Sequence, residues 1–220
     1  MKILGISTSS NIATVCLSED EEVIKEININ NTKTHSETLV PLIDNLLKET
    51  NTNLSEVNLL ACDIGPGSFT GIRIGISTIK AISESLNIPV VEVSSLEALA
   101  YSVNGSKNIC SIIDARNNQV YMAIFNQEYV LQENYFADDI NNLLKYLDKY
   151  EDMTFVGDGA ILHKELLGNR KISNLTEIHA KNINLCAFKK FKNGNYKNAD
   201  TLNPMYLRKS QAERMKDLNG

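Results

Sequence analysis

The pattern of apolar and polar positions is most regular between Leu59 and Leu86. The run from Leu59 to Ile64 is apolar except for Asp63, which is typical of a strand buried on both faces of a parallel sheet. A glycine-rich turn of sequence GPGSFTG follows, in which Ser68 or Thr70 can cap a helix. Helical spacing of apolar residues then predicts a helix from about Thr70 to Leu86.

A strand, a glycine turn and a helix start gather backbone N–H groups at one point, where an anion such as a phosphate can bind. Neither phosphate-binding fingerprint fits this turn. The sequence has no GxxxxGK[ST], and the glycines at 65, 67, 71 and 75 are wrongly spaced for GxGxxG. A purely structural turn and a phosphate cradle both remain open.

The predicted helix is apolar around most of its circumference. At about 100° per residue only a narrow polar band is left, made of Arg73, Ser77, Lys80 and Glu84. Gly71 and Gly75 leave a flat patch where another backbone can approach closely. Such a helix is either enclosed in its own domain or pressed against another chain, and periodicity alone favours enclosure.

The rest of the first half alternates strands and helices. Strands are predicted at Lys2–Ile6, Thr14–Leu17, Glu22–Ile29 and Val90–Val93. Leu39, Leu42, Ile43, Leu46 and Leu47 recur at helical spacing. Thr34 and Glu37 form a capping box for that helix, although Pro41 then requires a later start near Thr38 or a kink. Ser94 and Glu97 form a second capping box, which opens a helix to about Tyr101.

Beyond a loop at Asn104–Ser106 the order of elements restarts. We predict strands at Ile109–Ile113, Gln119–Phe125, Tyr129–Phe136 and Met153–Val156, with a helix at Asp138–Tyr150. Gly157-Asp158-Gly159 opens a further helix toward Leu167, a short strand ends near Ile178, and a helix covers Asn182–Lys192. The residues after Arg208 are polar and predicted to be loosely held.

Two successive β-β-β-α-β-α units predict an α/β protein with two similar subdomains, residues 1–105 and residues 106–220. Each is predicted to be a mixed sheet with flanking helices. Functional sites are expected in the cleft where strand ends and turns of the two subdomains converge.

Composition restricts the function. The chain has 220 residues, 43% hydrophobic and 22% charged, which is ordinary for a globular protein. A net charge of −5 disfavours strong nucleic-acid binding by this chain alone, and Lys189, Lys190, Lys192 and Lys197 form at most a minor basic edge. Four dispersed cysteines predict reduced core thiols. With no signal peptide or membrane-spanning run, we expect a cytoplasmic protein.

The sequence offers little catalytic machinery. His35, His163 and His179 are isolated, with no HxxxH or HExxH spacing, so no metal site is predicted. Ser68 lacks a GxSxG context and an identifiable base. Peptidase activity therefore has no support in the residues.

Several motifs, in order along nearly the whole chain, resemble the bacterial TsaB (YeaZ) family. GPGSFTGIRIGISTIKAI at Gly65–Ile82 is the most specific, joined by ILGISTS, THSETLVP, VSSLEALA, DARNNQVY, GDGA and PMYLR. The resemblance implies an actin-like, sugar-kinase-like (ribonuclease H-like) fold in two subdomains, of which the second is abbreviated. It also implies a protein that does not catalyse alone and that needs no cofactor of its own.

The resemblance further implies a scaffold and activator for the paralogue TsaD, which carries the metal and active site, and the small ATPase TsaE. Together they place threonylcarbamoyl on the adenosine beside the anticodon of tRNAs that read codons beginning with A. This chain would meet tRNA only through the complex, and would form a homodimer when TsaD is absent. The resemblance implies that TsaD and a second copy of the chain bind the same surface, which is formed by the two helices of the first subdomain. With the resemblance, an interface is therefore favoured over a purely internal role for the apolar and glycine positions of these helices, namely Leu39, Leu42, Ile43, Leu46, Gly71, Ile72, Gly75, Ile76 and Ile79.

Actin-like ATPases carry an aspartate in the first hairpin turn, whereas the matching position here is Ser7, where many family members keep Asp. Asp114 is its counterpart in the second hairpin turn, although a turn residue bonded to its own backbone is the alternative for it. ATP or ADP at the partner interface would lie near Ser7, Gly67, Ser68, Arg73 and Asp114. An independent ATPase or small-molecule kinase that uses this cleft is the second hypothesis.

Overall fold

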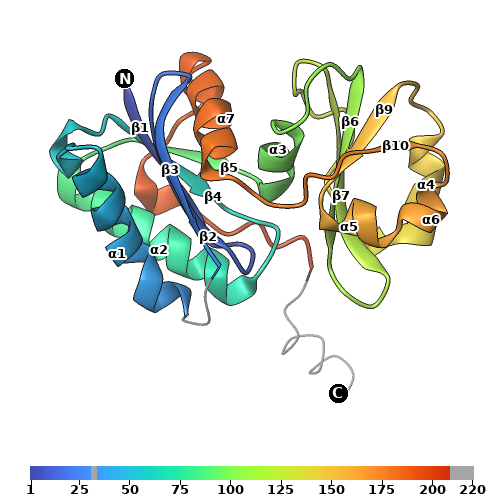
Figure 1. Ribbon diagram of the computed structural model, residues 1–220, viewed down its shortest axis with the longest axis horizontal. Helices are drawn as coiled ribbons and strands as arrows, with labels where there is room; N and C mark the ends of the chain where they lie inside the picture. Colours follow the sequence, from blue (N-terminus) through green and yellow to red (C-terminus); the bar gives the residue numbers. More distant parts are fainter. Residues whose placement is uncertain (31–33, 209–220) are drawn as a thin grey trace.

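The computed structural model describes residues 1–30 and 34–208, which form two five-stranded sheets side by side (Figure 1). The first sheet has the order β3-β2-β1-β4-β5. Its strands are β1 (Lys2–Ser7), β2 (Ala13–Glu19), β3 (Glu22–Ile29), β4 (Leu59–Asp63) and β5 (Val90–Val93). β1, β2 and β3 form an antiparallel meander, while β4 and β5 run parallel to β1.

Alternate side chains of the first sheet enter two different cores, as the period of two along a strand requires. Leu4, Ile6 and Leu60 pack under α1 (His35–Glu49) and α2 (Phe69–Leu86). Ile3 and Leu59 point to the other face, which α3 (Ser95–Ala100) and α7 (Ala180–Lys192) cover. Short 3-10 turns occur at Leu54–Glu56 and Ala199–Thr201.

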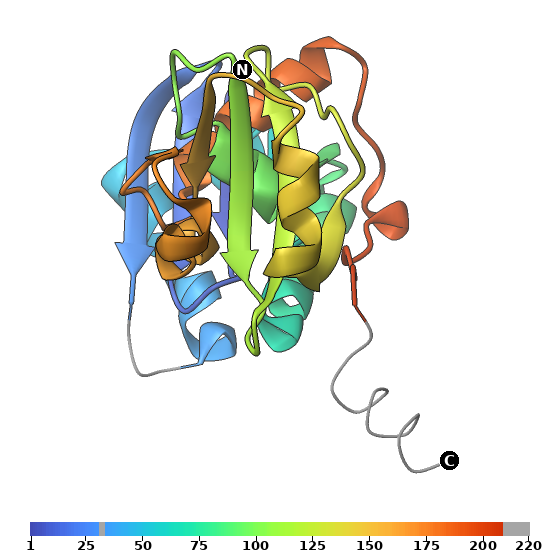
Figure 2. The same cartoon turned by 90° about the vertical axis from the view of Figure 1, so that its right-hand side faces the viewer.

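The second sheet has the order β10-β9-β6-β7-β8. Its strands are β6 (Asn108–Asp114), β7 (Gln119–Asn126), β8 (Phe136–Asp139), β9 (Met153–Val156) and β10 (Lys171–Ile172). α4 (Ile140–Leu147), α5 (Asp158–Leu162) and α6 (Lys164–Leu167) flank it, and they are the yellow and orange helices in front of the sheet in Figure 2. The fold is α/β with two actin-like subdomains, as predicted.

The predicted assignment of all of residues 106–220 to the second subdomain needs a correction. The strands of the first sheet all precede residue 106 and those of the second sheet all follow it. The chain then leaves the second sheet, and α7 packs on β1 and β2 of the first sheet (Figure 1). Further along, Val90 and Lys197 exchange two backbone hydrogen bonds of 2.9 Å, and Leu202 enters the core below α2. The first sheet requires this return because its second face is apolar.

Some predicted elements differ from the structure. The strand predicted at Tyr129–Phe136 is mostly irregular chain. Tyr129 has a left-handed backbone (φ 62°), Leu131 forms an isolated bridge with Phe125 of β7, and regular pairing begins at Phe136. The helix expected toward Leu167 breaks at His163 into α5 and α6. The strand predicted near Ile178 is absent among the described residues, where β10 lies earlier. Pro41 lies inside α1, which begins at His35 with the predicted capping box.

The predicted loose tail after Arg208 lies outside the described residues. Within those residues, no helix combines the length and apolar character needed to cross a membrane.

Candidate functional site

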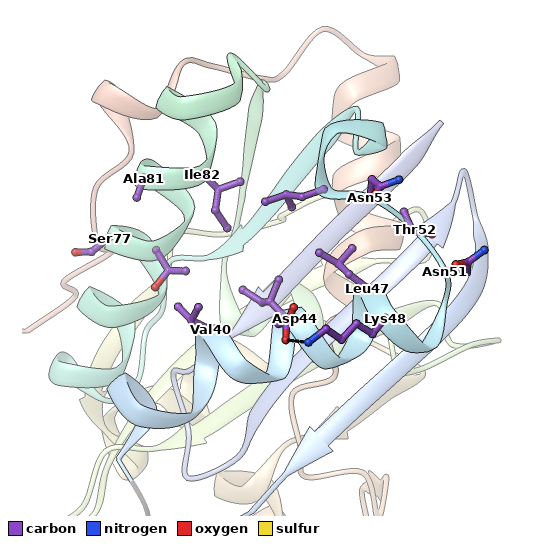
Figure 3. A pocket seen from close by; sticks show the side chains of 13 residues that line it. Val40, Asp44, Leu47, Lys48, Asn51, Thr52, Asn53, Ser77, Ala81 and Ile82 are labelled. Carbon is purple, nitrogen blue, oxygen red and sulfur yellow. Dashed lines mark hydrogen bonds and ion pairs between the residues drawn. The ribbon is translucent and has the colours of Figure 1, made fainter.

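A groove of about 910 Å³ runs between α1 and α2 on the outer face of the first subdomain (Figure 3). Its walls are mainly apolar, and Val40 at its edge is 59% exposed. On the α1 side, between Val40 and Asn51, the Asp44 carboxylate and the Lys48 ammonium form an ion pair of 2.6 Å. The other lining residues are Ile43, Leu47, Asn51, Thr52, Asn53, Leu54, Ser77, Thr78, Ala81 and Ile82.

The side chains proposed from the sequence to meet a partner lie instead in the subunit's own core. The seven proposed side chains on α1 and α2 are each at most 5% exposed, namely Leu39, Leu42, Ile43, Leu46, Ile72, Ile76 and Ile79. They pack on Leu4, Ile6 and Leu60 of the sheet. For α2 this is the enclosure that periodicity alone favoured, before the family resemblance favoured an interface. Ile43 is the member of this set that also lines the groove. Whether the helix pair binds a partner stays a prediction.

The two glycines of α2 also serve the subunit itself. A Cβ atom on Gly71 would overlap the carbonyl oxygen of Thr8, and one on Gly75 would lie 2.6 Å from the Thr8 hydroxyl oxygen. The Thr8 hydroxyl donates to the Gly71 carbonyl at 2.7 Å. The flat patch on α2 therefore seats the turn between β1 and β2.

A second hollow, a cleft of about 510 Å³, lies between the subdomains. The first subdomain contributes the β1–β2 turn and the glycine turn after β4, and the second contributes the β6–β7 turn and the start of α5. Its charged lining residues are Asp114, Arg116, Asp158 and Arg208. This is the convergence of strand ends and turns that the sequence predicted.

Three of the five residues proposed near a nucleotide line this cleft, namely Gly67, Ser68 and Asp114. Ser7 does not, because it is 1% exposed and its hydroxyl donates to the Asp63 carboxylate at 2.6 Å. Arg73 is not among the lining residues either, and its Nε donates to the Tyr206 hydroxyl at 2.6 Å.

The glycine turn already uses part of its hydrogen-bonding capacity. The Ser68 amide donates to the Ser9 carbonyl at 2.7 Å. The Ser68 hydroxyl caps α2 by accepting from the Gly71 amide at 3.2 Å. The turn thus has a structural task that does not require a ligand.

Asp114 and Asp158 are both engaged with backbone amides. Asp114 accepts from the Arg116 amide of its own turn at 2.9 Å, which is the turn-residue arrangement considered as its alternative. Asp158 accepts from the amides of Asp114 at 3.0 Å and Gly159 at 2.8 Å. Burial raises the pKa of Asp158, and the charge of Asp114 adds to this.

Sequence reasoning missed a buried polar hub below the cleft. The Asp63 carboxylate accepts from the hydroxyls of Ser7, Ser9 (2.5 Å) and Ser95 (2.7 Å), and from the Gly65 amide at 2.9 Å. Asp63 is 2% exposed, and burial raises its pKa against the lowering effect of these hydrogen bonds. The hub ties β1, β4, the glycine turn and α3 together.

The remaining polar candidates have structural contacts. His35 Nε2 lies 2.8 Å from the Ser10 carbonyl oxygen, which joins α1 to the β1–β2 turn. Lys190 pairs with Glu97 at 2.7 Å and Lys197 with Glu92 at 2.7 Å, so the basic edge is partly neutralised. Among residues 1–30 and 34–208, no group of three or more His, Cys, Asp or Glu residues is placed to hold a metal ion.

Comparison with known proteins agrees with the fold. A family model described as "TsaD: tRNA N6-adenosine threonylcarbamoyltransferase" matches residues 22–214. The chain is similar to the tRNA threonylcarbamoyladenosine biosynthesis protein TsaB of Bacillus subtilis, with 32% identity over 76% of this chain and 75% of the relative. The protein of the same description from Escherichia coli is 34% identical over 61% of this chain and 57% of its own length.

Among solved structures, YeaZ from Pseudomonas aeruginosa superposes with a TM-score of 0.82 and 26% identity, covering 94% of this chain and 99% of that one. Fold and cleft together define an actin-like α/β protein of two subdomains. The chain belongs to the family that the matching model describes, and within it to the TsaB (YeaZ) group of tRNA threonylcarbamoyladenosine biosynthesis proteins.

Proposed function

We propose that this chain is a non-catalytic scaffold and activator in the synthesis of tRNA threonylcarbamoyladenosine. It acts in the cytoplasm by binding TsaD through the α1–α2 groove, and the resulting pair works with TsaE on tRNA. A second copy of the chain occupies the same groove when TsaD is absent. The groove, an apolar hollow left open to solvent on a family member, carries this proposal.

The composition of the groove suits a protein partner. Its apolar side chains and the exposed Asp44–Lys48 pair on its α1 side provide the apolar core and polar rim typical of protein interfaces. Exposed Val40 would lose water contact on docking, which favours association. Two helices from each side would form a four-helix interface, and self-pairing would satisfy the same surface symmetrically.

The cleft supports a role without catalysis by this chain alone. At the end of β1 a buried serine stands where actin-like ATPases carry an aspartate, so the first-subdomain wall offers hydroxyls rather than a carboxylate. On the opposite wall, Asp114 and Asp158 are held by backbone amides. We propose that ATP or ADP, where it binds, occupies the complex at the partner boundary.

The decisive experiment compares two single substitutions of exposed aliphatic residues. Val40→Glu adds a charge at the groove, and Leu162→Glu adds the same charge on α5, where the residue is 61% exposed. Both variants are expected to remain folded by circular dichroism. Val40→Glu should lose co-purification with TsaD and fail to support threonylcarbamoylation of tRNA in a reconstituted assay, because docking would desolvate an unpaired charge. Leu162→Glu should retain both properties.

Normal TsaD binding by folded Val40→Glu would contradict the groove as the interface. Modification of tRNA by TsaD and TsaE at full rate without this chain would contradict the scaffold role itself. The alternative, an independent ATPase or small-molecule kinase, would instead show steady ATP turnover by the purified chain that Asp114→Asn abolishes.

A further inference from the structure

Two tyrosines and a lysine bridge the subdomains. Tyr101, at the end of α3, stacks on Tyr129 from the β7–β8 connection, with ring centroids 4.1 Å apart and planes 20° apart. The Lys189 ammonium of α7 lies 5.1 Å from the centroid of each ring. We call these three residues the tyrosine clamp. It joins α7, which packs on the first sheet, to a connection of the second sheet.

Hydrogen bonds reinforce the clamp. The Tyr129 hydroxyl donates to the Val103 carbonyl at 3.1 Å and lies 2.9 Å from the Asn104 side-chain oxygen, so the second sheet holds the segment that links the subdomains. Nearby, the Ser94 hydroxyl, at the start of α3, lies 3.4 Å from the hydroxyl of Tyr135.

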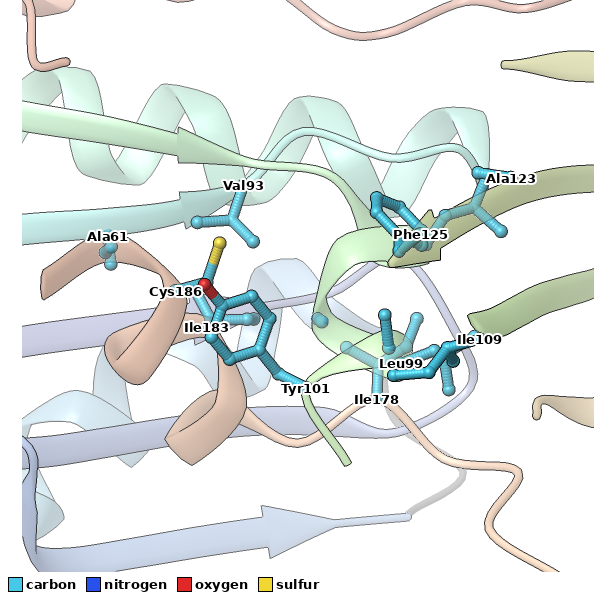
Figure 4. Close-up of a cluster of buried hydrophobic side chains, with 14 of the residues drawn as sticks. Ala61, Val93, Leu99, Tyr101, Ile109, Ala123, Phe125, Ile178, Ile183 and Cys186 are labelled. Carbon is cyan, nitrogen blue, oxygen red and sulfur yellow. The ribbon is translucent and has the colours of Figure 1, made fainter. Parts of the chain in front are cut away.

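The clamp borders a hydrophobic core that both sheets share (Figure 4). Ala61, Val93 and Ile183 enter it from the first subdomain, and Ile109 and Phe125 from the second. α3 lies between them and is almost wholly enclosed, since Leu96 is 0% and Leu99 is 1% exposed. Leu99 also lines the cleft, so the residues that fill this core form part of the cleft wall.

We propose that the tyrosine clamp and the shared core hold the two subdomains as one rigid body, so that the cleft keeps one width with or without nucleotide. Rotation of one sheet against the other would slide Tyr129 off Tyr101 and expose apolar side chains of the shared core to water. The cleft therefore presents a fixed surface and does not close around a ligand.

The test measures a distance across the molecule by electron paramagnetic resonance of two spin labels. Labels are attached at Glu84→Cys in α2 and Glu165→Cys in α6, both exposed positions. The four native cysteines are buried and their thiol pKa values are raised by burial, to about 12 for Cys186, so they resist labelling. Distances are recorded with and without Mg-ATP.

We expect one narrow distance distribution whose mean does not change with Mg-ATP. Tyr129→Ala should broaden it, because the stack, the lysine contact and the linker hydrogen bonds are all lost. Tyr146→Ala is the matched control, since Tyr146 packs on Phe136 at 4.6 Å with Lys145 and Lys149 near its ring, all within the second subdomain. That variant should leave the distribution unchanged.

Lys189→Gln removes only the charge from the clamp and should also broaden the distance distribution. It tests the clamp if Tyr129→Ala does not fold. A wild-type distribution that is bimodal or shifts with Mg-ATP would overturn the proposal. Wild-type distributions in the folded clamp variants would overturn it equally.

Discussion

Because of Asp63, the free energy of unfolding is expected to depend on pH. Burial raises its pKa above the ordinary value of 3.8, so between that pH and the folded pKa the folded chain holds a proton that the unfolded chain releases. The stabilising contribution of Asp63 is thus complete below the ordinary value and is lost as pH rises through the folded pKa. Asp63→Asn removes this dependence, because a carboxamide does not titrate.

In urea unfolding at pH values from about 4 to 7, the stability of Asp63→Asn relative to wild type is expected to increase with pH. The change should be about 1.4 kcal/mol for each unit by which the folded pKa is raised. A difference that stays constant over this range would contradict the argument. Asp63→Ala should be less stable than Asp63→Asn throughout, because three buried hydroxyls then lose their acceptor.

The hub around Asp63 was not predictable from local sequence. Ser7 ends β1, Ser9 lies in the β1–β2 turn and Ser95 is the first residue of α3, and only the fold brings them to one carboxylate. A signal did exist, since Asp63 alone interrupts the apolar run of a strand predicted to be buried on both faces. A buried carboxylate requires hydrogen-bond donors, so that interruption indicates a polar cluster without identifying its members.

At the scale of elements, α2 is seated by its glycines on the β1–β2 turn. Gly71→Ala is expected to lower the free energy of unfolding by roughly 2–3 kcal/mol, because the new Cβ meets the backbone carbonyl of Thr8, which cannot rotate away. Gly75→Ala should cost much less, because its obstacle is the Thr8 hydroxyl and alanine favours the helix by about 1 kcal/mol. Urea denaturation of the two variants measures the difference.

A Thr8→Ala background provides the control for these two substitutions. There Gly75→Ala should become stabilising, while Gly71→Ala should remain costly because the Thr8 carbonyl is still present. Gly71→Ala with wild-type stability would show that the turn can move and that the glycine serves another purpose, such as approach of a second chain.

Strands and helices with a clear local sequence pattern were predictable, whereas segments whose conformation depends on tertiary contacts were less predictable. Val90–Val93 and Met153–Val156 are strands as predicted, because short apolar runs between turn residues fit only the sheet interior here. The residues from Tyr129 to Phe136 also include β-favouring side chains, yet Tyr129 is left-handed and stacks on Tyr101, and Leu131 forms an isolated bridge to β7 in place of a regular ladder. A tertiary contact there overrides the local pattern.

At the scale of the whole molecule, the repeated order of elements predicted two subdomains, but it did not predict where α7 packs. Sequence order does not state which sheet a helix covers. The apolar face of α7 matches either sheet in pattern, and the choice depends on contacts such as the Asn184 side-chain amide, which donates to the carbonyls of Ile3 and Cys16 at 3.1 Å. The candidate groove could not be predicted from the sequence either. Periodicity identified the apolar faces of α1 and α2, but it did not show which of their side chains the sheet would bury.

The return of α7 and the shared core together predict one cooperative folding unit. In scanning calorimetry the chain is expected to unfold in a single transition with equal calorimetric and van't Hoff enthalpies. A fragment of residues 1–105 should not fold stably, because without α7 the face of the first sheet that carries Ile3 and Leu59 is exposed to water. Two resolved transitions, or a fragment with native-like chemical shift dispersion, would show that the first subdomain is complete without the returning helix.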